Sequence, residues 1–147
     1  VSLTYEWTVD GIVQSTTGPS LSGPFTYPSS VSCTATPFDG IDQGSPTAAY
    51  TNIENTKPTI ASISLTPTIA YTNEVLSASF TISDIDANQS TSSTIEWHVV
   101  DAQTGNDTIV STTGTSLDGA VYFEKDDIVY IKVTPFDGFE YGNIIVI

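Results

Sequence analysis

The 147-residue chain has no arginine and no methionine, and only three lysines, one histidine and one cysteine. Against these stand 17 acidic residues, which give a net charge of -14 at pH 7. Phosphate backbones and anionic lipid head groups would repel such a chain, so we expect no nucleic-acid partner. The absence of methionine indicates a processed chain or an excised piece.

The single cysteine, Cys33, excludes a disulfide within the chain. Cys33 alternates with Val31 and Ala35 along a predicted strand, which predicts a buried thiol that packs as a small hydrophobic side chain. No apolar run approaches the roughly 20 residues that a membrane-spanning helix needs. We therefore expect no membrane insertion in this segment.

Charged residues make up only 14% of the chain, whereas serine and threonine together exceed a quarter of it. This composition predicts a neutral surface rich in hydroxyl groups rather than a salt-adapted cytosolic one. Such a surface suits an extracellular or cell-surface protein.

The chain contains an internal repeat, centred on a joint at residues 54–59. Three stretches occur twice: residues 5–9 return as 95–99, residues 15–18 as 111–114, and residues 36–40 as 134–138. The offset of 90 to 98 residues is too long for a solenoid repeat and fits a string of separate β-sandwiches. We therefore predict two domains, residues 1–56 and residues 57–147.

Both predicted domains consist of strands and turns with no helical period. In the first, Leu3 to Val9 alternates in polarity and Asp10-Gly11 predicts a two-residue hairpin turn, so we expect about five strands. In the second we expect about seven, including one at residues 120–123. The prediction is an all-β, antiparallel chain.

The first domain has no counterpart of the two strands that open the second one, at residues 58–65 and 75–82. A sandwich without these two leading strands has an open edge and an uncovered core, which favours pairing with another strand. Two explanations remain open at this point. Either the chain was cut from a longer array, or a neighbouring subunit donates the strands.

The repeated tryptophan strands, residues 130–138, the pair Asp84 and Asp86, and the joint at residues 55–59 together resemble a known family. They look like the tandem immunoglobulin-like repeats of large bacterial and archaeal surface proteins, which are related in shape to PKD, fibronectin type III and cadherin modules. The resemblance implies tandem antiparallel Ig-like β-sandwiches. It also implies a structural or adhesive role in a long surface protein or filament, with neighbouring repeats or subunits as partners.

In that family's topology the joint and two of the turns lie at one pole of the sandwich. The resemblance therefore implies that oxygen ligands gather there, which are the ligands that calcium prefers. The candidates are Glu54, Asp84, Asp86, Asn88 and Asp137. The alternative is that aspartate and asparagine are simply common in turns.

Catalysis finds little support in the sequence, so we expect a protein that is not an enzyme. His98 lies between Trp97 and Val99, on the opposite face of its strand from the tryptophan, and we expect it to face solvent. No second histidine is present for a zinc site. Trp7 and Trp97 have apolar neighbours two residues away, which favours a place in the core over a sugar-stacking surface.

The sequence offers candidate residues both for binding a glycan and for carrying one. Tyr122 and Tyr130 are the only aromatic residues that we place on an outward face, and an exposed row of aromatics would suit an accessory carbohydrate-binding module of a secreted enzyme. Asn88 and Asn106 begin sequons for N-glycosylation in predicted turns.

Overall fold

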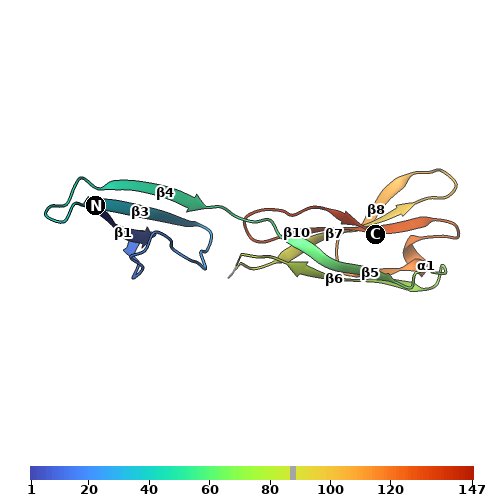
Figure 1. The fold of residues 1–147 in the computed structure, drawn as a ribbon. Helices are drawn as coiled ribbons and strands as arrows, with labels where there is room; N and C mark the ends of the chain where they lie inside the picture. The colour runs from blue at the N-terminus through green and yellow to red at the C-terminus, as the bar shows by residue number, and fades with distance from the viewer. Residues whose placement is uncertain (87–88) are drawn as a thin grey trace. The chain divides into compact units, whose positions relative to one another are not determined.

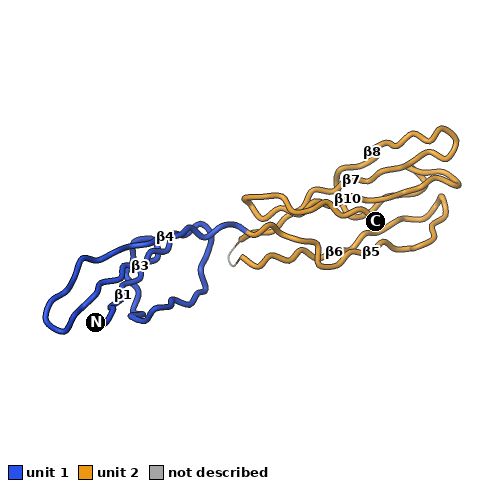
Figure 2. Tube along the Cα trace, turned by 45° about the horizontal axis from the view of Figure 1, so that its top comes forward, with its two compact units in different colours: residues 1–55 blue, residues 56–147 orange. Residues whose placement is uncertain are grey.

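A computed structural model of the chain describes residues 1–86 and 89–147. The chain divides into two compact units, unit 1 (Val1–Asn55) and unit 2 (Thr56–Ile147), which Figure 2 shows in different colours. Strands dominate both units, and every strand pair is antiparallel. The prediction of an all-β, antiparallel chain is confirmed.

Unit 1, every residue of which is described, has a single sheet of four strands in the order β2-β1-β3-β4. The strands are β1 (Ser2–Val9), β2 (Ile12–Val13), β3 (Ser29–Phe38) and β4 (Thr47–Ile53). The turn between β1 and β2 has positive φ at both Asp10 (49°) and Gly11 (78°), which is the hairpin geometry that the Asp-Gly pair predicted. We expected about five strands in this unit, and the structure has four.

The described part of unit 2 has two sheets, β11-β10-β7-β8 and β5-β6-β9 (Figure 1). The strands are β5 (Thr59–Thr66), β6 (Val75–Ser83), β7 (Ser92–Val100), β8 (Asp107–Ser111), β9 (Ser116–Asp118), β10 (Ile128–Phe136) and β11 (Ile145–Val146). Their number matches the prediction.

The strand predicted at residues 120–123 is wrong. Residues Gly119–Tyr122 form the short helix α1, and the strand β9 precedes it. The Asp118 side chain accepts a hydrogen bond from the Ala120 amide (3.0 Å) and thereby caps the first turn of the helix. The cap satisfies a backbone donor locally, which favours the turn over an extended strand at this point.

The core of unit 2 lies between its two sheets. Its buried residues come from both layers and are Leu76, Ala78, Trp97, Val99, Leu117, Phe123, Ile131 and Val133. A β-bulge between Ile60 and Ser62 in β5 shifts the alternation, so that Ile60, Ile63 and Leu65 all pack against this core. Strict alternation would place Ile60 on the opposite face from Ile63 and Leu65.

The sheet of unit 1 has the same strand order as the larger sheet of unit 2, when β2, β1, β3 and β4 are matched with β8, β7, β10 and β11. The indole nitrogen of Trp7 donates to the carbonyl of Gly18 (3.0 Å), as that of Trp97 does to Gly114 (3.2 Å). What differs is the burial of the two indoles. Trp97 is fully buried, whereas Trp7 is only partly buried.

Cys33 is half-buried rather than buried, which corrects the prediction. It pairs with Trp7 in the register of β1 and β3, where unit 2 pairs the fully buried Ile131 with Trp97. Unit 1 has one sheet, so no second sheet covers this face.

We predict that Gly142→Ala destabilises unit 2 by about 1–3 kcal/mol, because overpacking a tight site costs energy of this order. A Cβ at Gly142 would overlap the carbonyl oxygen of Pro58 and would lie 2.8 Å from Cγ of Pro135. The measurement is denaturant unfolding followed by Trp97 fluorescence in a Trp7→Phe background. The control is Gly18→Ala, where a Cβ meets no atom within 4 Å. Equal stability of the two variants would contradict the prediction.

Candidate functional site

The predicted calcium ligands Asp84 and Asp86 lie immediately after β6, and both carboxylates accept hydrogen bonds from backbone amides. Oδ1 of Asp84 accepts from the amide of Asp86 (2.9 Å), and Oδ2 of Asp86 accepts from the amide of Thr56 (2.6 Å). Oδ2 of Asp84 is shielded from solvent and has no hydrogen-bond partner among the described residues. A shielded carboxylate oxygen without a partner is costly, so a ligand at this atom would stabilise the turn.

Asp137 occupies the turn after β10 and is 1% exposed. Its Oδ1 accepts hydrogen bonds from the amides of Phe139 (2.7 Å) and Glu140 (2.6 Å). Asp39 holds the matching turn of unit 1 in the same way, through the amides of Ile41 and Asp42. These hydrogen bonds hold the pKa of the Asp39 carboxyl below its ordinary value. Asp137 therefore has a local role as a turn-closing acceptor.

The five predicted ligands belong to different parts of the chain. Glu54 belongs to unit 1, while Asp84, Asp86 and Asp137 belong to unit 2, and Asn88 lies outside the described residues. Among the residues that the structure describes, no three acidic, histidine or cysteine side chains form a group suited to a metal ion. The calcium site remains a prediction that rests on Asp84 and Asp86.

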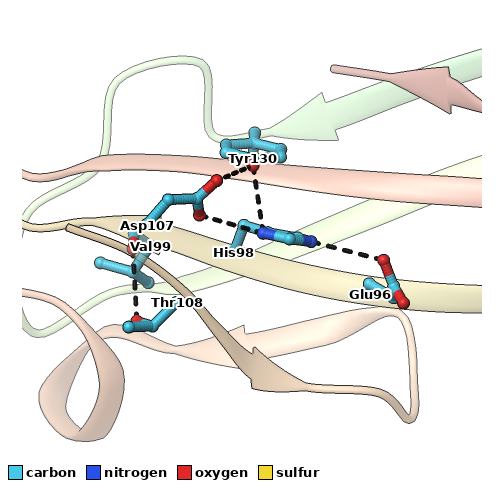
Figure 3. Close-up of polar contacts among 6 residues, drawn as sticks. All are labelled: Glu96, His98, Val99, Asp107, Thr108 and Tyr130. Atoms are coloured by element: carbon cyan, nitrogen blue, oxygen red, sulfur yellow. Dashed lines mark hydrogen bonds and ion pairs between the residues drawn. The ribbon is translucent and has the colours of Figure 1, made fainter.

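His98 is buried, which corrects the expectation that it faces solvent. It lies on the outer face of the larger sheet, surrounded by Glu96, Asp107 and Tyr130 from β7, β8 and β10 (Figure 3). Its ring stacks on Tyr130, with centroids 4.6 Å apart and planes inclined by 13°. The tyrosine ring thus covers a histidine that strand alternation alone would leave exposed.

Four polar side chains form a continuous network around this ring. Nδ1 of His98 lies 3.0 Å from Oδ1 of Asp107 and 3.1 Å from the Tyr130 hydroxyl, and Nε2 lies 3.4 Å from Glu96. The Tyr130 hydroxyl donates to Oδ2 of Asp107 (2.5 Å). Figure 3 shows the Asp107 carboxylate beside the two rings, joined to both the histidine and the tyrosine. The network joins three adjacent strands through their side chains.

The hydrogen bond from Tyr130 has opposite effects on the two pKa values that it couples. It lowers the pKa of Asp107 below its ordinary 3.8, and the contact with His98 adds to this effect. It raises the pKa of Tyr130 from 10.0 to about 12, because loss of the phenolic proton would leave two negative groups in contact. At neutral pH the arrangement therefore holds an ionised Asp107 and a protonated Tyr130.

Sequence reasoning missed this network because Asp107 and Tyr130 lie on other strands than His98. Glu96 lies two residues from His98, so alternation alone would have placed it on the same face. Tyr130 lies opposite His98 only in the register of β7 and β10. Asp107 pairs with Val100, two residues from His98, so it reaches the histidine diagonally between β7 and β8. A signal from sequence would have required the strand register, which the repeat by itself does not supply.

The remaining predicted site residues in the described part of the chain, Tyr122, Tyr130 and Asn106, belong to different elements. Tyr122 is on α1 and 41% exposed, while Tyr130 is on β10 with one ring face against His98. Asn106 is exposed in the turn before β8, and its carbonyl accepts from the amide of Asp101 (3.0 Å). The second sequon asparagine, Asn88, lies outside the described residues. Modification of Asn106 stays a prediction.

No family model, no curated protein and no solved structure matches this chain. In the described ranges, no helix has the length and apolar character needed to cross a membrane.

We predict that unit 2 loses stability at both ends of the pH scale through the Asp107–Tyr130 pair. The raised pKa of Tyr130 contributes stability that is complete below pH 10 and is lost as pH rises through about 12. The lowered pKa of Asp107 contributes stability above pH 3.8 that is lost as pH falls further.

Tyr130→Phe should remove the alkaline part of this dependence, because phenylalanine has no proton to lose. The measurements are the ultraviolet absorbance of tyrosinate and thermal unfolding between pH 7 and pH 12. Tyr122→Phe, at an exposed position on α1, is the matched control. If the two variants had the same alkaline profile, Tyr130 would have no part in it.

Proposed function

We propose that the chain is a non-catalytic structural segment of a long extracellular surface protein or filament, built from tandem Ig-like modules. Its work would be spacing, adhesion or assembly, with neighbouring repeats or subunits as partners. The observation that carries the proposal is the shared design of the two units. A chain that repeats one sheet and its turns along its length suits a molecule whose function depends on length and surface rather than on a single site.

The turns support the proposal in detail. After β3 the amide of Gly44 donates to the carbonyl of Pro37 (2.9 Å), and after β10 the amide of Gly142 donates to Pro135 (2.8 Å). The turn carboxylates Asp39 and Asp137 each accept from the amides two and three residues ahead. Repetition of such contacts is expected of tandem modules with one fold.

We predict that antibodies against unit 2 label intact cells of the producing organism. The surface is acidic and rich in hydroxyl groups, which suits exposure to the medium. Labelling is measured by microscopy before and after permeabilisation, with an antibody against a cytosolic protein as the control. Labelling that appears only after permeabilisation would overturn the extracellular assignment.

The proposal includes a calcium ion at the turn after β6, held by Asp84 and Asp86. Support comes from the shielded Oδ2 of Asp84, which has no hydrogen-bond partner in the described part of the chain. Calcium accepts carboxylate and backbone oxygens in flexible geometry, so two carboxylates in one turn can contribute to its shell.

We predict that Asp84→Asn and Asp86→Asn each weaken calcium binding by about tenfold or more, a loss of at least roughly 1.4 kcal/mol. Isothermal titration calorimetry on the full chain measures the affinity. Asp42→Asn, an exposed aspartate of unit 1, is the matched control and should bind as the parent does. A parent chain that binds no calcium, or variants that bind equally well, would contradict the calcium proposal without touching the structural role.

A filament subunit completed by strand donation is the second candidate function, and the single sheet of unit 1 favours it. An accessory carbohydrate-binding module receives less support. Its two candidate aromatics lie on different elements, and Tyr130 already stacks on His98.

A further inference from the structure

In unit 2 a short segment after β8 forms a strand by pairing with the edge of β6. Residues Ser116–Asp118 become β9 by pairing with β6 in the register Ser116–Ser77, Leu117–Leu76 and Asp118–Val75. Two flanking hydrogen bonds extend the pairing, from the amide of Ala78 to the carbonyl of Thr115 (2.7 Å) and from that of Gly119 to Glu74 (2.8 Å). Leu117 is then 1% exposed.

Unit 1 contains almost the same sequence, because residues 15–23 (STTGPSLSG) match residues 111–119 (STTGTSLDG). The entry to this stretch is also held in the same way, by the indole hydrogen bonds to Gly18 and Gly114. Yet residues 20–22 belong to no strand, and Leu21 is only half-buried. Unit 1 therefore contains the counterpart of β9, residues 20–22, but no counterpart of β6 for it to pair with.

The apolar face of the unit 1 sheet also has a counterpart in unit 2. In unit 2 the paired residues Trp97 and Ile131 are fully buried beneath β5 and β6, whose Ile63, Leu76 and Phe80 belong to or pack against the core. In unit 1 the corresponding pair, Trp7 and Cys33, is half-buried. In unit 2, therefore, the strands β5 and β6 cover the face that is half-buried in unit 1.

We propose that unit 1 binds a β-hairpin from outside residues 1–147, with the chemistry of β5 and β6. One strand of this hairpin runs antiparallel to residues 20–22 and places an apolar side chain opposite Leu21. Its inward face is apolar, to cover Trp7 and Cys33, and its outward face carries neutral serine and threonine. The proposal concerns a binding surface and does not depend on the extracellular role proposed above.

The occupant is a separate hairpin rather than a second copy of this chain. In unit 2, β6 is paired on one side with β5 and on the other with β9, so its two edges are both used. Its apolar face is packed in the core of its own unit. A second copy would have to open unit 2 in order to supply these strands, and this would expose about as much apolar surface as it covers.

The test is the full chain with a second copy of residues 57–90 joined ahead of Val1. Trp7 and Trp97 are offset by 90 residues, so Val1 then follows residue 90 of the added copy as Thr91 does in unit 2. We expect the amides of residues 20–22 to exchange hydrogen at least about tenfold more slowly than in the parent chain, because strand pairing protects amides. The fluorescence of Trp7 should also shift to shorter wavelength as its indole becomes covered.

The matched control carries Leu76→Asp and Phe80→Asp in the added copy only, and unit 2 keeps its own residues. This control should leave residues 20–22 and Trp7 as they are in the parent. Equal protection with the intact and the altered hairpin, or none with either, would overturn the proposal. If the parent chain dimerised and protected the same amides without any extension, the occupant would be a second copy and the proposal would again be wrong.

Discussion

The structure depends on one constraint, which is that a β-sheet with an apolar face must cover that face. Unit 2 meets it by packing β5, β6 and β9 against β7 and β10, with Trp97 and Ile131 fully buried between the layers. Burial of apolar surface stabilises by roughly 25 cal/mol per Å², so a large aromatic side chain in this position contributes strongly. Unit 1 has the same sheet order without the second layer, and its Trp7 and Cys33 stay half-buried.

A second feature explains how so acidic a chain folds without many basic partners. Several of its aspartates accept hydrogen bonds from backbone amides in turns, among them Asp39, Asp101 and Asp137. Such bonds stabilise the charged form of the carboxylate locally, and for Asp39 and Asp101 they lower the pKa. Much of the acidity thus serves turn geometry. Asp84 differs from these aspartates, because its Oδ2 is shielded from solvent and has no hydrogen-bond partner in the described residues.

The network around His98 shows how the outer face of a sheet can become an organised polar cluster. Cross-strand neighbours lie about 4.5–5.5 Å apart at Cβ, which allows the rings of His98 and Tyr130 to stack while their polar atoms meet Asp107. The cluster joins β7, β8 and β10 on the side away from the apolar core. The larger sheet is therefore held by packing on one face and by hydrogen bonds on the other.

The sequence by itself determined the all-β class, most of the strands and the Asp10-Gly11 hairpin, because alternation and turn chemistry are local properties of the chain. It also located the two leading strands of residues 57–147 and their lack of a counterpart earlier in the chain. Only the tertiary structure decided that His98 is buried, that Ile60 joins the core and that residues 119–122 turn into a helix. The physical reason is that the burial of His98 and Ile60 depends on strand register and a bulge, which bring together residues from different strands. The helix begins where the pairing of β9 with β6 ends.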